Sequence, residues 1–204
     1  MSEHVVDYRD SLLPDFKFKG RKVCVLTNYR TGSTFFIRET FLTNRIMPMG
    51  NWEHFNSEQD FNFLLDQCRQ RTAFVFKLMP DQIQYSQEKF NDILGECDEI
   101  VYLYRRDFEA QAKGWVAWNV VGDHDHHYGE MKMYNVKTTQ QEANKYIQQL
   151  IDNYKFMNES FKKFPGNVYC VEDFPIQIPY ARLYNWEVNI EIPSFNTHKE
   201  VFRS

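Results

Sequence analysis

The residues best suited to bind an anion form one short segment, Thr27–Thr34, with the sequence Thr-Asn-Tyr-Arg-Thr-Gly-Ser-Thr. Gly32 lets the backbone approach a ligand closely, and the first amide N–H groups of a helix point at an anion that the helix dipole also favours. The hydroxyls of Ser33 and Thr34 and the guanidinium of Arg30 add donors. This composition predicts a cradle for phosphate or sulfate, and the alternative is an ordinary turn with a Ser/Thr cap.

The same turn differs from the loop that binds nucleoside triphosphates. That loop has the pattern G-x-x-x-x-G-K-[ST], whereas Ser33 follows Gly32 where the pattern requires Lys. Kinases also use Mg²⁺ to manage the triphosphate charge, and no obvious acidic partner ends the second or third predicted strand. A P-loop-like nucleotide kinase of unusual sequence therefore stays as an alternative that would depend on ATP and Mg²⁺.

Strands and helices alternate around this turn. Four short apolar runs have the length and composition of buried strands: Lys22–Thr27, Thr72–Leu78, Ile100–Tyr104 and Asn167–Val171. Helices are predicted at Ser33–Thr43, Ser57–Arg71, Gln82–Leu94, Glu109–Asn119 and in a long segment after Thr139. The pattern predicts an α/β fold, a P-loop-like three-layer sandwich with a central parallel sheet of about four to five strands flanked by helices. Such sheets bind ligands beyond the carboxyl ends of their strands.

Two of the helix starts resemble capping boxes, Ser57 with Asp60 and Thr139 with Glu142. Val120–Lys137 has no clear period, so we expect a long loop there. Residues 1–20 are polar and irregular and predict a loosely attached arm, followed by a single domain at 21–204.

The overall composition limits the function classes. The 204 residues carry a formal net charge of -4, which argues against a general nucleic-acid binder. The first residues lack the basic and apolar regions of a secretory signal, and no apolar run approaches the ~20 residues of a membrane span. Without a C-x-x-C pair, we expect reduced thiols and a cytoplasmic protein. The four cysteines are Cys24, Cys68, Cys97 and Cys170.

Arg30-Thr-Gly-Ser-Thr34 after a strand resembles the 5'-phosphosulfate loop of sulfotransferases that use 3'-phosphoadenosine-5'-phosphosulfate (PAPS). Further segments are similar, in order, to the trehalose (glycolipid) sulfotransferase branch: Gly50–Phe55, Phe76–Met79, Val101–Asp107, Ala110–Ala112 and Val171–Phe174. Trp52 stands where that branch has proline. The resemblance spans about residues 22–174 and implies in-line transfer of a sulfuryl group from PAPS to a hydroxyl, on a carbohydrate or glycolipid acceptor.

The resemblance also implies residue roles. Glu53 would be the general base, with adjacent His54 as second choice and an exposed loop Glu as the alternative for Glu53. Arg30 would stabilise the leaving group, and Lys77 could reach the sulfuryl oxygens or lie at the surface. Arg106 is favoured over Arg105 for the 3'-phosphate, and the other arginine could pair with an acidic neighbour, Asp107 or Glu109. The cofactor-binding set is Arg30, Thr31, Gly32, Ser33, Thr34, Arg105, Arg106, Lys113 and Gly114.

One family residue is replaced. The family places a serine in the helix after the 3'-phosphate arginine, and this chain has Gly114 there when counted from Arg106, or Lys113 when counted from Arg105. The missing hydroxyl leaves room for a third hypothesis, a sulfotransferase fold that binds nucleotide without turnover. No metal is required, because the transferred group carries one negative charge, and we expect no nucleic-acid partner. By analogy the trehalose branch also suggests a homodimer.

Two further sets of residues, one rich in histidine and one aromatic, could belong to a binding site. His124–His127 invites a metal interpretation, although a solvated loop or acceptor lid fits consecutive ligands better. Trp115, Trp118 and Tyr128 could stack on a sugar or on adenine, while packing of a helix face explains the two tryptophans equally well.

Overall fold

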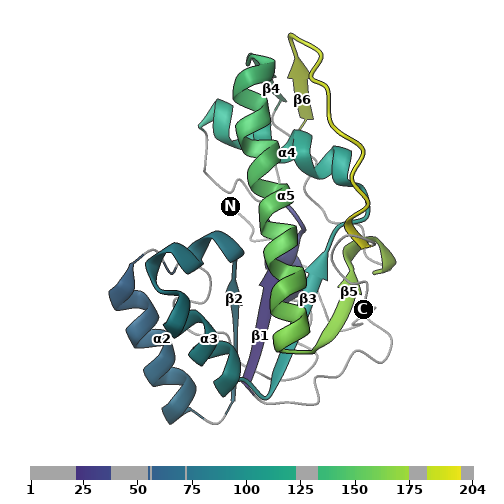
Figure 1. Cartoon of the computed structure of the whole chain (residues 1–204). Helices are drawn as coiled ribbons and strands as arrows, with labels where there is room; N and C mark the ends of the chain where they lie inside the picture. Colours follow the sequence, from purple (N-terminus) through teal and green to yellow (C-terminus); the bar gives the residue numbers. More distant parts are fainter. Residues whose placement is uncertain are drawn as a thin grey trace, which may run out of the picture.

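A parallel sheet forms the centre of the fold (Figure 1). The computed structural model describes residues 22–37, 55, 57–71, 73–122, 133–174 and 183–198. The strands of this sheet are β1 (Lys22–Thr27), β2 (Phe74–Leu78), β3 (Glu99–Tyr104) and β5 (Asn167–Cys170), in the order β2-β1-β3-β5. They coincide with the four predicted strands apart from small shifts at their ends, so the α/β prediction is confirmed.

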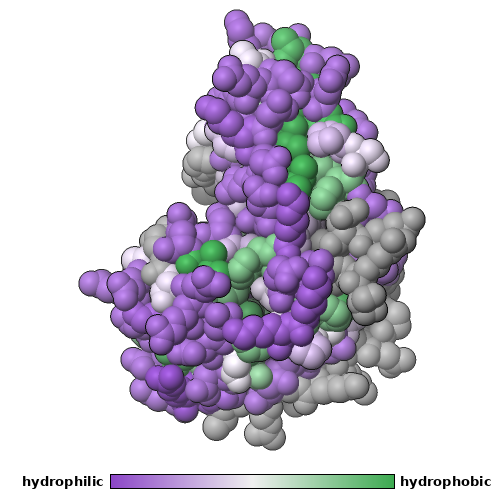
Figure 2. Space-filling view, in the orientation of Figure 1, coloured by the Kyte–Doolittle hydropathy of each residue, from purple (hydrophilic) through white to green (hydrophobic). Residues whose placement is uncertain are grey.

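Helices cover both faces of the sheet. One face packs against α2 (Glu58–Gln70), α3 (Gln87–Glu96), α4 (Phe108–Val121) and α5 (Gln140–Lys163). Residues 33–37 are helical and pack on the opposite face. The outer surface of the first group is mainly hydrophilic (Figure 2), as expected for helices with one apolar side.

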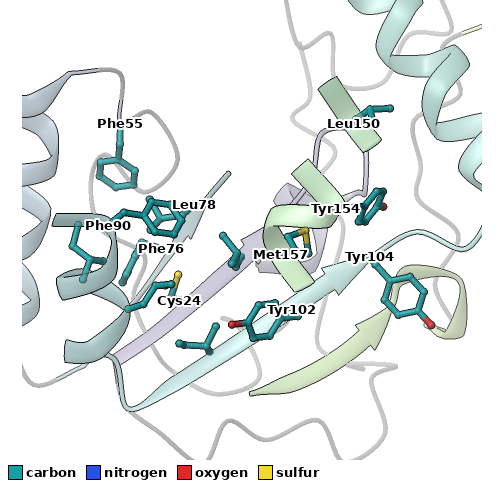
Figure 3. Close-up of a cluster of buried hydrophobic side chains, with 14 of the residues drawn as sticks. Cys24, Phe55, Phe76, Leu78, Phe90, Tyr102, Tyr104, Leu150, Tyr154 and Met157 are labelled. Carbon is teal, nitrogen blue, oxygen red and sulfur yellow. The ribbon is translucent and has the colours of Figure 1, made fainter. Parts of the chain in front are cut away.

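Side chains of each strand alternate between the two faces. Val23 and Val25 of β1 pack with Phe36, whereas Cys24 belongs to the larger cluster on the other face. In Figure 3, Cys24 and other strand side chains extend toward the helices. Met157 of α5 belongs to the same cluster of buried side chains. Because both faces are buried, the strands are continuous apolar runs, and each fully buried large side chain contributes roughly 1.5–3 kcal/mol.

The predicted helix caps are present. Ser57 Oγ accepts a hydrogen bond of 3.2 Å from the Asp60 N–H, and Thr139 Oγ1 accepts one of 3.2 Å from the Glu142 N–H. The helical residues expected around Gln82–Leu94 are present and form two elements, a 3₁₀ helix, η1 (Pro80–Tyr85), and α3. Ser86 separates them and caps α3.

The expected long loop at Val120–Lys137 is partly wrong. α4 continues to Val121, and β4 (Met133–Val136) pairs in parallel with β6 (Leu183–Trp186) in a second, two-stranded sheet. β4 contacts α4, and its buried side chains alternate with exposed ones. Within the ranges given above, no helix combines the length and the apolar character that crossing a membrane requires.

Candidate functional site

The strand order creates a switch point beside β1. The chain places β2 on one side of β1 and then β3 on the other, so the connections after β1 and β3 diverge at the carboxyl end of the sheet. Ligands of open parallel sheets bind at such a point. Arg105, which follows β3, donates a hydrogen bond of 3.3 Å from Nη1 to the backbone oxygen of Arg30, which follows β1. The two segments predicted to bind phosphates are therefore in contact.

The turn after β1 has a left-handed backbone at two positions. φ is 56° at Arg30 and 81° at Gly32. Glycine adopts this region freely, whereas a residue with a side chain is strained by about 1–2 kcal/mol and needs its surroundings to hold it. Inside the turn, Thr27 Oγ1 and Thr31 Oγ1 lie 2.6 Å apart. The Phe36 N–H donates a bond of 3.0 Å to the Gly32 oxygen and so begins the helix.

The remaining predicted cradle residues lie where this helix starts. Ser33 is the first helical residue and is buried like Thr31, whereas Gly32 and Thr34 are partly exposed. The first amides of a helix have no carbonyl one turn earlier with which to bond. The backbone here therefore has the form that the predicted anion cradle requires.

The Arg30 side chain lies along α4. Its Cζ is 5.1 Å from the centroid of the Trp118 ring, a cation–π contact. A Cβ built on Gly114 would lie 3.8 Å from Arg30 Nε, so Gly114 faces this guanidinium. Lys113 instead pairs with Glu109 at 2.7 Å, on the outer side of the helix. The structure thus places Gly114 beside Arg30 of the turn, whereas Lys113 pairs with Glu109 of its own helix.

Arg105 and Arg106 have different surroundings. Arg105 Nε is buried without a hydrogen bond among the described groups and lies 3.5 Å from Glu172 Oε1. Arg106 Nη2 lies 2.6 Å from Asp173 Oδ1, in a pair whose side chains are 60% and 62% exposed. Arg105 is therefore tied to the turn, whereas Arg106 sits in an exposed ion pair.

The carboxylates suggested as structural partners of these arginines act elsewhere. Asp107 caps α4 by accepting a hydrogen bond of 2.9 Å from the Ala110 N–H, and Glu109 binds Lys113. The expected pairing of one arginine with Asp107 or Glu109 is thus replaced by the pairs with Glu172 and Asp173.

Glu172 holds the end of β3. It lies in η2 (Val171–Asp173), directly after β5, and accepts hydrogen bonds from the N–H groups of Arg106 at 2.9 Å and Asp107 at 3.1 Å. Burial alone would raise the pKa of this carboxyl, but the backbone donor of Arg106, the Cys170 thiol and the Asp107 N–H outweigh it and lower the pKa. The Val171–Phe174 motif therefore supplies a brace for the loop after β3.

A buried polar network, missed by the sequence analysis, connects the two halves of the site. Gln111 of α4 is fully buried, donates a bond of 2.6 Å to the Tyr29 oxygen and accepts one of 2.7 Å from the Tyr154 hydroxyl. That hydroxyl also accepts from the Arg105 N–H at 3.2 Å. Figure 3 shows Tyr154 of α5 near the end of β3. Every hydrogen bond of this network joins residues that are distant in sequence, so no local sequence pattern predicts the network.

Asn28 fixes the start of the turn to α5. Its side-chain nitrogen donates a hydrogen bond of 2.8 Å to the Leu150 oxygen, and its side-chain oxygen accepts one of 3.1 Å from Asn153. Because all these groups are buried, they hold the turn rigidly.

Tyr29 joins a second polar cluster. Its ring stacks on Trp115 with centroids 3.8 Å apart and an interplanar angle of 7°, and its hydroxyl donates to Asp81 Oδ2. Gln149 donates to the same oxygen at 3.3 Å and accepts from the Trp115 ring N–H at 3.1 Å. Burial raises the pKa of Asp81, and the bond from Tyr29 only partly offsets this. Trp115 and Trp118 therefore contact other side chains, as the packing interpretation predicted.

The predicted catalytic residues are only partly described. Lys77 is buried in β2 opposite Val25, on the face that carries residues 33–37. Glu53 and His54 lie outside the described residues, as do Tyr128 and the His124–His127 segment. Phe55, the next described residue after Glu53 and His54, is fully buried in the larger core cluster.

Across the described ranges, no cluster of three His, Cys, Asp or Glu is suited to hold a metal ion. Comparison of the chain with models of known protein families and with curated proteins found no match.

Proposed function

We propose that this protein is a PAPS-dependent sulfotransferase that transfers a sulfuryl group to a hydroxyl of an acceptor, on a carbohydrate or glycolipid. One observation carries the proposal: the hydrogen bond from Arg105 to the Arg30 oxygen, which joins an anion-binding turn to a strand end rich in arginine. A ligand with phosphate groups at two positions, such as PAPS, matches two adjacent anion subsites at a switch point. The turn lacks the P-loop Lys, which favours PAPS over ATP.

The reaction requires mostly positioning and charge stabilisation. The acceptor oxygen attacks sulfur in line, the bond from sulfur to the bridging oxygen breaks, and its electrons stay on the 5'-phosphate of adenosine 3',5'-bisphosphate (PAP). Arg30 and the amides at Gly32–Thr34 would stabilise the negative charge that develops on this phosphate. Glu53 would accept the hydroxyl proton, with His54 as second choice, and Lys77 would contact the sulfuryl oxygens.

The two arginines after β3 would have separate tasks. Arg106 can exchange its partner Asp173 for the 3'-phosphate with little loss, because exposed ion pairs contribute only about 0–1 kcal/mol. Arg105 holds the turn through its Nη1 and pairs with Glu172 through its Nε. Because Gly114 has no side chain, the guanidinium of Arg30 is the hydrogen-bond donor nearest to this position of α4.

Isothermal titration calorimetry with PAP tests the proposal. Wild-type protein should bind PAP more tightly than AMP, which lacks the 3'-phosphate. Arg106→Ala should weaken PAP binding by at least about tenfold and leave AMP binding unchanged, since a hydrogen bond to a charged group contributes about 1.5–3 kcal/mol. Arg30→Ala and Arg105→Ala should weaken both ligands, because they alter the turn that both need.

Arg69→Ala is a matched control, because Arg69 forms an exposed pair with Glu96 on α2 and α3. It should leave both affinities unchanged. Absence of binding heat at millimolar PAP would refute the proposal. In assays of transfer from PAPS, Glu53→Gln should abolish turnover and preserve PAP binding; full activity would move the base assignment to His54.

A further inference from the structure

The side chain of Arg30 reaches from the turn after β1 to α4, where it meets an aromatic ring. Its Cζ is 5.1 Å from the centroid of the Trp118 ring. A Cβ built on Gly114, one helical turn before Trp118, would lie 3.8 Å from Arg30 Nε and 4.0 Å from Arg30 Cγ. Arg30 and Trp118 are both partly exposed, so this contact is open to solvent.

The backbone that carries the Arg30 side chain is held in place. The Arg30 oxygen accepts the hydrogen bond of 3.3 Å from Arg105 Nη1, and the Tyr29 oxygen accepts the one of 2.6 Å from the Gln111 side chain. The left-handed backbone of Arg30, with φ of 56°, is one that a residue with a side chain keeps only when its surroundings hold it. The turn therefore fixes where the side chain begins, and α4 fixes where its guanidinium lies.

A ring at the end of this side chain has a consequence for anion binding. An arginine has many rotamers, and a ligand that needs one of them loses affinity in proportion to how rarely that rotamer is populated. The ring attracts the cation and so raises the population of the rotamer that lies along α4. A planar guanidinium stacks through its face and donates hydrogen bonds from its edges. The contact with Trp118 is therefore compatible with a hydrogen bond from Arg30 to a phosphate.

We propose that Trp118 is a positioning residue for the 5'-phosphate subsite, because it holds the Arg30 guanidinium in the conformation that binds the leaving phosphate of PAPS. The inference rests on the proposed sulfotransferase function and gives Trp118 a role besides packing. Arg30 contacts the phosphate, and Trp118 acts only through Arg30. Loss of the ring should consequently weaken every ligand with a 5'-phosphate, with or without a 3'-phosphate.

Calorimetry with PAP and AMP on Trp118→Leu tests this role. We expect both affinities to fall by about two- to fivefold, the strength of a cation–π contact at an exposed site. Trp118→Phe keeps an aromatic face and should restore most of the lost affinity. Trp186→Leu is the matched control, because Trp186 is also partly buried and packs against the same core cluster. It should leave both affinities unchanged.

A double-mutant cycle separates positioning from a purely structural role. In the Arg30→Ala protein, the further change Trp118→Leu should leave PAP affinity unchanged, because the ring has no guanidinium to hold. An equal loss with and without Arg30, unchanged affinities in Trp118→Leu, or the same loss in Trp186→Leu would overturn the role of Trp118. A wild type that binds AMP as tightly as PAP would refute the sulfotransferase proposal alone, whereas one that binds neither nucleotide would refute both.

Discussion

Gly114 is the residue at which this chain departs from the sulfotransferase pattern, and the structure gives the departure a physical meaning. A Cβ at this position would be in ordinary van der Waals contact with Arg30, at 3.8 Å from Nε. The position therefore accepts a Cβ without displacing Arg30. Arg30 uses that space now, between Gly114 and the Trp118 ring.

Gly114→Ser should consequently tighten PAP binding by about tenfold or more, the contribution of one hydrogen bond to a charged phosphate, and leave AMP binding unchanged. Both affinities are measured by calorimetry. Gly95→Ser is the matched control, because Gly95 lies inside α3 with only Phe164 near its Cβ position, at 4.0 Å. Both variants should gain a few tenths of a kcal/mol in stability from better helix propensity. A similar change of PAP affinity in both would show that Gly114 is remote from the 3'-phosphate.

At the scale of elements, the junction of β3 and α4 depends on a carboxylate from another part of the chain. Glu172 accepts the N–H groups of Arg106 and Asp107, and these bonds keep its pKa below the usual range. A lowered folded pKa stabilises the protein above the unfolded pKa of about 4.3, and this stability is lost as pH falls through the folded value.

Glu172→Gln should therefore lower the free energy of unfolding by about 1–2 kcal/mol at pH 7, and the difference from wild type should shrink below about pH 4. Urea denaturation at the two pH values measures it. Asp173→Asn, in an exposed pair with Arg106, should cost at most about 1 kcal/mol. A deficit in Glu172→Gln that does not change with pH would contradict an electrostatic role.

At the scale of the whole molecule, local chemistry explains what the sequence could predict. The strands could be predicted because both faces of the sheet are buried, which makes each strand a continuous apolar run. Ser57 and Thr139 predicted helix starts because a cap acts within one helical turn. β4 and β6 could not be predicted in the same way, because they pair residues 133–136 with residues 183–186, which are distant in sequence. Short local motifs predicted the turn and the arginine pair. The hydrogen bonds of Gln111 to Tyr29 and of Tyr29 to Asp81 join segments that are distant in sequence, so no local motif could predict them.

The proposed ligand would contact segments from both sides of the sheet's switch point, so its binding should stabilise the chain as a unit. PAP at one hundred times its Kd should raise the free energy of unfolding by about 2.7 kcal/mol and Tm by several degrees, as mass action requires. Differential scanning fluorimetry measures the shift, and Arg30→Ala should abolish most of it at the same concentration. A larger shift with Mg²⁺-ATP than with PAP would favour the kinase alternative, because only a triphosphate site needs the metal to neutralise its ligand.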